Sequence, residues 1–262
     1  MKIEFKQIFL LAESSLIKQS MLSELDFQKQ YGVFKNFKKK NRSDNDFFQL
    51  LVMIIFYSGF KVAIVEKKEK IILGHFPDYK NVSIYSDADF EKIFSDSNMI
   101  KNERKIKSCI KNAKVFDKIV NQYGSFQNYI DSFDAQSSFE NLIFLKEELE
   151  FRFDYLGGVT VYHFLTDIGF NVLKPDRVIL RIFKRLGLIE NEKQLLKAIV
   201  LGQLFSKHTE IPIRYIDIIF VKYGQQGESE KFGLKNGICL EKEPNCKVCG
   251  LINYCKYNKT SP

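Results

Sequence analysis

The sequence predicts an all-α protein, and three observations support that expectation. Only five prolines and fourteen glycines interrupt its 262 residues, so few residues break long periodic segments. Apolar residues recur at spacings of three and four along several stretches, as they do on the buried face of a helix. Glycines follow these stretches at Gly124, Gly169 and Gly187, as they commonly do at helix C-termini. The length suits one large domain or two domains of about 100–150 residues.

The sequence predicts a series of helices along the chain. Residues 46–60 are too apolar for a surface helix, so we expect a core helix there. A shorter helix begins at Asp87 or Asp89, either of which can cap its N-terminus, and continues through Phe94. A long helix over residues 102–123 carries apolar residues at helical spacing. Further helices are expected over residues 139–153, 161–168, 176–186, 194–205 and 213–223.

Composition places the chain among ordinary globular proteins, since 45% of its residues are hydrophobic and 27% are charged. The sequence has no uninterrupted apolar run of about 18 residues, so no membrane span is expected. The N-terminal segment contains Glu4 and Glu13 and has no small-residue cleavage site, so we expect mature structure rather than a signal peptide. The net charge of +8 suits a polyanion such as nucleic acid and equally suits a solvated, lysine-rich surface.

Four of the five cysteines lie within the last 24 residues, in the pattern C-x6-C-x2-C-x5-C. Four thiolates in so short a loop can hold a soft metal centre. A zinc ribbon usually combines two C-x2-C pairs and only one is present, so the four cysteines by themselves leave an iron–sulfur cluster, zinc and no metal as alternatives. Reduced thiolates suit the cytoplasm, and Cys109 is expected to be an ordinary buried thiol. The candidate ligands are Cys239, Cys246, Cys249 and Cys255.

A second informative stretch covers residues 155–169. One helix is expected to end near Tyr155, and Gly157 and Gly158 turn the chain before a new helix starts by Val161. The free N–H groups at the start of that helix can point outward and donate to a phosphate, which grips a DNA backbone without reading its sequence. Two glycines between helices are common, so on its own the stretch favours a plain helix–helix turn.

The same stretch resembles the hairpin of the helix-hairpin-helix DNA glycosylases, which commonly reads L-P-G-V-G before a helix. Leu156, Gly158 and Val159 match that pattern. Gly157 replaces its proline, and Thr160 replaces its last glycine. In context, the resemblance favours a DNA-binding hairpin over a plain turn.

Two further motifs follow in the order that this family has them. The family carries an essential aspartate at a helix start of the form D-x-x-x-x-R, which matches Asp176 and Arg181. The cysteine spacing resembles the loop of the endonuclease III branch, and Pro244, two residues before the second cysteine, also fits that loop. The resemblance therefore implies a [4Fe-4S] cluster held by the four cysteines.

The middle of the chain, about residues 47–169, is similar to another branch, the constitutive 3-methyladenine DNA glycosylase. Tyr162, Phe164 and Ile168 match the hairpin pattern of that branch. The chain lacks the zinc-ligand cysteines and histidines of that branch and the base-contacting glutamate expected near Ile54. It also gains the aspartate and the cysteine loop, so it combines features of two branches.

The resemblance implies roles for single residues. Asp176 is the candidate catalytic residue, because a carboxylate can stabilise positive charge on the sugar or activate water; an aspartate after a proline is also a routine helix N-cap. Bifunctional relatives place an imine-forming lysine where this chain has Tyr162, so no lyase activity is expected. Tyr162 can instead line the base pocket or pack in the core.

The remaining candidate residues concern the flipped base and the DNA backbone. Phe60 is a candidate wedge for the gap that a flipped base leaves, and Tyr57 is a candidate pocket wall. Core packing explains either residue equally well. The candidate contacts to the DNA backbone are Gly157, Gly158, Thr160, Lys174 and Arg177.

The sequence thus predicts two helical domains with a DNA-binding cleft between them. We expect residues 46–169 to form a six-helix, barrel-like domain that ends in the helix-hairpin-helix, and the resemblance implies that residues 1–45 pair with 170–262 as the cluster-bearing domain. We expect a cytoplasmic, nucleoid-associated monomer that excises a damaged base, such as 3-methyladenine, from double-stranded DNA without lyase activity. The alternatives are a glycosylase for oxidised, deaminated, mismatched or modified bases, with or without lyase activity, and a non-catalytic DNA-binding iron–sulfur protein.

Overall fold

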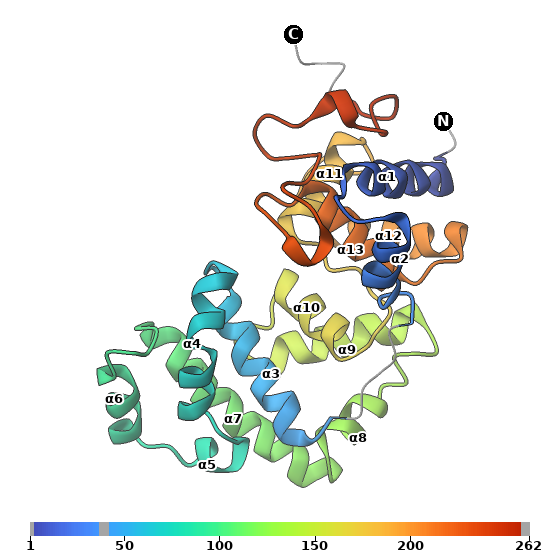
Figure 1. Ribbon diagram of the computed structural model, residues 1–262. Helices are drawn as coiled ribbons and strands as arrows, with labels where there is room; N and C mark the ends of the chain where they lie inside the picture. The colour runs from blue at the N-terminus through green and yellow to red at the C-terminus, as the bar shows by residue number, and fades with distance from the viewer. Residues whose placement is uncertain (1–2, 37–41, 258–262) are drawn as a thin grey trace. The chain divides into compact units, whose positions relative to one another are not determined.

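The computed structural model describes residues 3–36 and 42–257, and in these ranges it contains thirteen α-helices and two short 3-10 helices (Figure 1). The one β-type pairing in the described ranges is an isolated bridge between Ser229 and Leu234. The all-α expectation is therefore confirmed. Among the described residues, no helix combines the length and the apolar character that crossing a membrane requires.

Contacts within the chain divide it into two units. The hairpin unit consists of residues 39–170, and the cysteine unit consists of residues 1–38 with 171–262. From sequence we expected six helices in the first of these, but its described residues form eight. The difference includes two short helices, α5 (Tyr79–Ser83) and α8 (Phe126–Asp131). Each starts after a capping side chain, of Asp78 or Ser125, that accepts a hydrogen bond from an amide in the first turn of the helix.

The core of the hairpin unit forms around α3, whose side chains from Leu51 to Phe56 are all buried. A capping box between Ser43 and Asp46 starts this helix. The rings of Phe116 and Phe126 stack with their centroids 4.3 Å apart and join α7 to α8. The helices of the unit are α3 (Asp44–Tyr57), α4 (Val62–His75), α5 (Tyr79–Ser83), α6 (Asp87–Ser95), α7 (Glu103–Tyr123), α8 (Phe126–Asp131), α9 (Phe139–Arg152) and α10 (Val159–Asp167).

Two helix ends show how local chemistry sets the boundaries. The side chain of Asn102 accepts a hydrogen bond from the Lys105 amide at 3.1 Å and so starts α7, and Gly124, with a φ of 81°, ends it. Helix α10 begins earlier than the expected Val161. Gly158, with a φ of 57°, takes its N-cap position, so Val159 is already helical.

The cysteine unit brings the two ends of the sequence together. Helix α1 packs on α12 and α13, so the blue N-terminal helix lies among the orange C-terminal helices (Figure 1). The ring of Phe205 lies 5.6 Å from that of Phe183 and 5.2 Å from that of Phe220, between centroids, and these contacts join α11, α12 and α13. The helices are α1 (Phe5–Gln19), α2 (Glu24–Gly32), α11 (Arg177–Arg185), α12 (Leu195–Thr209) and α13 (Ile213–Gly224), with 3-10 turns at Glu230–Phe232 and Cys246–Val248.

Candidate functional site

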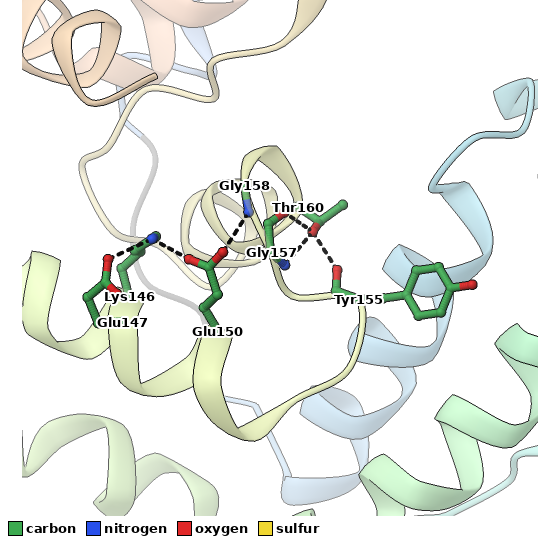
Figure 2. Close-up of polar contacts among 7 residues, drawn as sticks. All are labelled: Lys146, Glu147, Glu150, Tyr155, Gly157, Gly158 and Thr160. Carbon is green, nitrogen blue, oxygen red and sulfur yellow. Dashed lines mark hydrogen bonds and ion pairs between the residues drawn. The ribbon is translucent and has the colours of Figure 1, made fainter. Parts of the chain in front are cut away.

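The turn between α9 and α10 is organised by one hydroxyl group (Figure 2). The Thr160 hydroxyl accepts a hydrogen bond from the Gly157 amide at 3.0 Å and lies within donating distance of the carbonyl oxygens of Gly157 and Tyr155. A proline at position 157 would lack that amide, and a glycine at position 160 would lack that hydroxyl. The two departures from the L-P-G-V-G pattern are therefore complementary.

A carboxylate lies against the same turn. The Gly158 amide donates to Oε1 of Glu150 at 3.0 Å, and Lys146 pairs with Glu150 and, at 2.8 Å, with Glu147 (Figure 2). A Cβ on Gly157 would lie 3.2 Å from that oxygen, so the glycine makes room for Glu150. From sequence we expected free, outward-pointing amides at the start of this helix, but the amides of Gly157 and Gly158 in the turn donate within the protein, to Thr160 and Glu150.

Tyr162 lies inside the hairpin unit. Only 4% of the residue is exposed, and burial raises the pKa of its phenol, with Lys146 acting in the opposite direction. Burial also lowers the pKa of Lys146, but its hydrogen bonds to Glu147 and Glu150 outweigh that effect, so the pKa of this ammonium is above its ordinary value. The amine that interacts with Tyr162 is therefore an ion-paired cation.

The candidate wedge and pocket residues lie where α3 ends. Tyr57 is the last residue of the helix and is half-buried. Phe60 is also half-buried and follows Gly59, whose φ of 78° allows the chain to turn there. Ile54 is only 1% exposed, so the position of the missing glutamate belongs to the core. Tyr57 and Phe60 both keep part of their surface accessible.

A buried lysine supports this end of α3. Only 3% of Lys105 is exposed, and its ammonium donates to the carbonyl oxygens of Ile55 and, at 2.7 Å, Ser58. It lies 4.6 Å from the ring centroid of Tyr155 and 5.5 Å from that of Phe60. Burial lowers the pKa of Lys105 to about 8. This role was not predicted from the sequence, because a lysine in the first turn of an amphipathic helix normally faces solvent.

Asp176 caps α11 in the cysteine unit. Its Oδ1 accepts hydrogen bonds from the amides of Val178 at 2.9 Å and Ile179 at 3.0 Å, and the residue is half-buried. The N-cap role that the sequence allowed is therefore present. Both hydrogen bonds use the same oxygen, so the cap geometry is compatible with a second role for the carboxylate.

Basic residues flank this aspartate along the chain. Arg177 is exposed and Lys174 is half-buried. Arg177 lines a surface depression in which basic residues outnumber the two carboxylates of Glu192 and Glu241. Such a depression favours an anion over a cation. Its other basic lining residues are Arg181, Lys184, Arg185 and Lys256.

The four C-terminal cysteines line one small cavity. Arg185 donates to the sulfur of Cys239 at 3.2 Å, and the Tyr223 hydroxyl lies 3.1 Å from the sulfur of Cys249. Such contacts suit anionic sulfur ligands, and four sulfurs are the donor set that iron–sulfur clusters use. Within the described ranges, no group of three or more His, Cys, Asp or Glu side chains has the geometry of a metal-ion site.

The N-terminal helix contributes to the cysteine loop. The hydroxyl of Ser15 on α1 accepts a hydrogen bond from the Gly250 amide at 3.0 Å. A Cβ on Gly250 would lie 2.2 Å from that hydroxyl oxygen, so the close approach requires glycine. The Tyr254 hydroxyl also donates to Glu4. The first helix thus holds the loop that carries the cysteines, a role that the sequence did not indicate.

The chain also matches a known protein family. A family model described as methyladenine glycosylase matches residues 35–176, which is more than half of the chain. The matched range contains the end of α3, the hairpin and, as its last residue, Asp176.

Solved structures show the same fold. The 8-oxoguanine glycosylase/lyase of Methanocaldococcus jannaschii, in complex with a 15mer DNA containing 8-oxoguanine, superposes with a TM-score of 0.54 at 17% identity, over 80% of this chain and 94% of that one. An endonuclease III–DNA covalent intermediate gives 0.52 at 16% identity, over 91% and 98%. The 8-oxoguanine DNA glycosylase of Thermotoga maritima gives 0.51 at 15% identity, over 83% and 95%.

Proposed function

This chain belongs to the methyladenine glycosylase family of helix-hairpin-helix DNA glycosylases, and from that premise we propose that it excises an alkylated purine such as 3-methyladenine from double-stranded DNA in base excision repair. The observation that carries the proposal is the family match over residues 35–176, which includes the hairpin and ends on Asp176. The enzyme acts as a cytoplasmic, nucleoid-associated monomer.

Asp176 is the catalytic residue of the proposed reaction. Breaking the N-glycosidic bond develops positive charge on the deoxyribose, and a fixed carboxylate stabilises that charge or activates the attacking water. The cap hydrogen bonds hold Oδ1 of Asp176, so we assign the sugar-facing role to Oδ2. The base must leave the duplex stack first, and the half-buried Phe60 and Tyr57 support roles as wedge and pocket wall.

The reaction stops at the abasic site. An imine-forming lysine would stand at the position of Tyr162, and a phenol cannot form an imine. Lys146, which interacts with Tyr162, is paired with two carboxylates, and an ammonium without a lone pair is no nucleophile.

The four cysteines would hold a [4Fe-4S] cluster. The donor set fits this group, because Cys239, Cys246, Cys249 and Cys255 line one cavity. When bound, the cluster supplies a covalent cross-link that fixes the loop, and the excision chemistry needs no redox step from it. Arg185 holds that loop by donating to the backbone carbonyls of Leu240 at 2.6 Å and Glu241 at 2.9 Å.

Single-turnover base release tests the function. Duplexes that each carry one altered base (3-methyladenine, another alkylated purine, 8-oxoguanine, uracil or a mismatch) are incubated with excess protein, and the free base is identified. We expect release of the alkylated purine. Release of only an oxidised or deaminated base would move the protein to another substrate class, and release of no base would leave a DNA-binding protein.

The Asp176→Asn variant tests the catalytic residue. Asparagine caps helices as well as aspartate does, so fold and DNA affinity should persist while the excision rate falls by about 100–1,000-fold. Asp78→Asn is the matched control, because Asp78 caps α5 in the same way through the Asn81 amide at 2.9 Å. An Asp176→Asn variant as fast as the control would remove this aspartate from the mechanism.

A further inference from the structure

A second carboxyl group lies deep in the cysteine unit and is tied to the segment that leads to Asp176. Asp217 on α13 is only 2% exposed. Its Oδ1 accepts a hydrogen bond from the Lys174 amide at 3.2 Å, and its Oδ2 pairs with the Arg214 guanidinium at 3.2 Å. A helix side chain thus holds the backbone two residues before the candidate catalytic carboxylate.

The hydrogen bonding continues along the backbone from Lys174 to Asp176. The Lys174 carbonyl accepts a hydrogen bond from the Asp176 amide at 2.8 Å. The carboxylate of Asp176 is then fixed by the amides of Val178 and Ile179. One continuous chain of hydrogen bonds therefore runs from Asp217 through Lys174 to Asp176.

Hydrogen bonds also hold the start of the segment that leads to Asp176. The Ile213 amide, at the first residue of α13, donates to the side-chain oxygen of Asn171 at 2.9 Å. Gln203 on α12 donates to the Asn171 carbonyl at 3.1 Å. Residues 171–174 are therefore anchored at both ends, and Asp217 forms the anchor nearer to Asp176.

Stabilisation of the fold does not by itself explain why the carboxyl group of Asp217 is buried at this position. Burial raises the pKa of Asp217 to about 7; the Arg214 guanidinium lowers it and the Asp176 carboxylate raises it again. Replacing a buried ion pair by apolar side chains of similar volume is often neutral or stabilising. A costly group that holds the backbone beside a reacting carboxylate fits a positioning role better than a purely structural one.

We propose that Asp217 is a positioning residue for Asp176, acting through the Lys174 amide and without contact to the DNA. This inference rests on the proposed function, because it takes Asp176 to be the catalytic residue. Displacement of a reacting group by about 1 Å can cost about 100-fold in rate. Loss of the hydrogen bond between the Lys174 amide and Asp217 should therefore slow base excision while DNA binding persists.

Two substitutions at Asp217 separate the effect of its hydrogen bond with the Lys174 amide from the effect of its charge. Asp217→Asn keeps an oxygen that can accept from the Lys174 amide, whereas Asp217→Leu has the same branched shape and no acceptor. We expect Asp217→Leu to lower the single-turnover excision rate about 10–100-fold and Asp217→Asn to stay within about threefold of the wild type. The Kd for the same duplex should change less than about twofold in both, and hydrogen exchange over residues 171–179 should accelerate only in Asp217→Leu.

Each result supports or overturns the positioning role of Asp217. If Asp217→Leu does not fold by circular dichroism, Asp217→Ala takes its place in the same comparison. Excision by the acceptor-free variant at the wild-type rate would overturn the inference and leave the proposed function intact. An equal loss of excision and DNA binding would reduce Asp217 to a structural residue. A wild-type protein that releases no base would overturn the proposed function and this inference together.

Discussion

Oε1 of Glu150 accepts a hydrogen bond from the backbone amide of Gly158 at 3.0 Å. A carboxylate thus holds one of the amides that a DNA phosphate would need if the hairpin bound DNA as its sequence predicts. Phosphate and carboxylate are both anions, so they compete for this amide and repel each other. Lys146, paired with Glu150, offsets part of that repulsion.

Removing the charge of Glu150 should therefore strengthen DNA binding. Glu150→Gln keeps an oxygen that can accept from Gly158, so the turn should persist while the repulsion is lost. We expect the Kd for duplex DNA to fall by about 3–10-fold at low salt, measured by fluorescence anisotropy. Glu147→Gln is the matched control, because Glu147 pairs with the same Lys146 and no hydrogen bond to Gly158 is seen for it. Equal or weaker binding by Glu150→Gln would argue against a phosphate at this turn.

The buried ammonium of Lys105 should make stability depend on pH. Its pKa falls from 10.5 to about 8 on folding, so between these values the unfolded chain binds more protons at this site than the folded chain. The free energy of unfolding should therefore rise with pH across that window. Lys105→Met should lack this contribution in urea unfolding followed by circular dichroism. Lys107→Met, at an exposed position on the same helix, should parallel the wild type; a parallel Lys105→Met profile would contradict the prediction.

The cysteine loop should carry iron. Anaerobically purified protein should contain about four iron atoms per chain and absorb visible light as an iron–sulfur chromophore, by metal analysis and absorption spectroscopy. Cys249→Ser should lose most of the iron and much of its solubility, because the loop loses its cross-link. Cys109→Ser is the matched control, since Cys109 lies buried on α7, and it should keep its iron. One zinc and no iron in the wild type would contradict the assignment.

Base excision should leave an intact strand with an abasic site, cut only after alkali. Borohydride should trap no covalent protein–DNA complex, because Tyr162 stands where an imine-forming lysine would. Tyr162→Phe should behave identically on both counts, by gel electrophoresis of the labelled strand. A trapped complex in the wild type would reveal lyase chemistry at another amine, and its loss in Lys105→Met or in Lys146→Met would identify that amine.

Local patterns predicted much of the fold. The helix over residues 102–123 lies within one residue of α7, because both of its ends depend on neighbours, the Asn102 cap and the left-handed Gly124. The N-cap role of Asp176 was visible for the same reason. The early start of α10 was not predicted, because it depends on the conformation that Gly158 takes in the turn.

The sequence by itself determined the helical class, the ends of several helices and the order of the motifs, because each depends on residues within a turn or two of one another. Tertiary structure alone decided where the buried charges find partners: Lys105 at the carbonyls of Ile55 and Ser58, and Asp217 at the Lys174 amide. A buried charge is stable only when packing brings a partner to it, and these partners lie more than 40 residues away along the chain. A sequence pattern over neighbouring residues does not indicate which residues far apart along the chain come into contact.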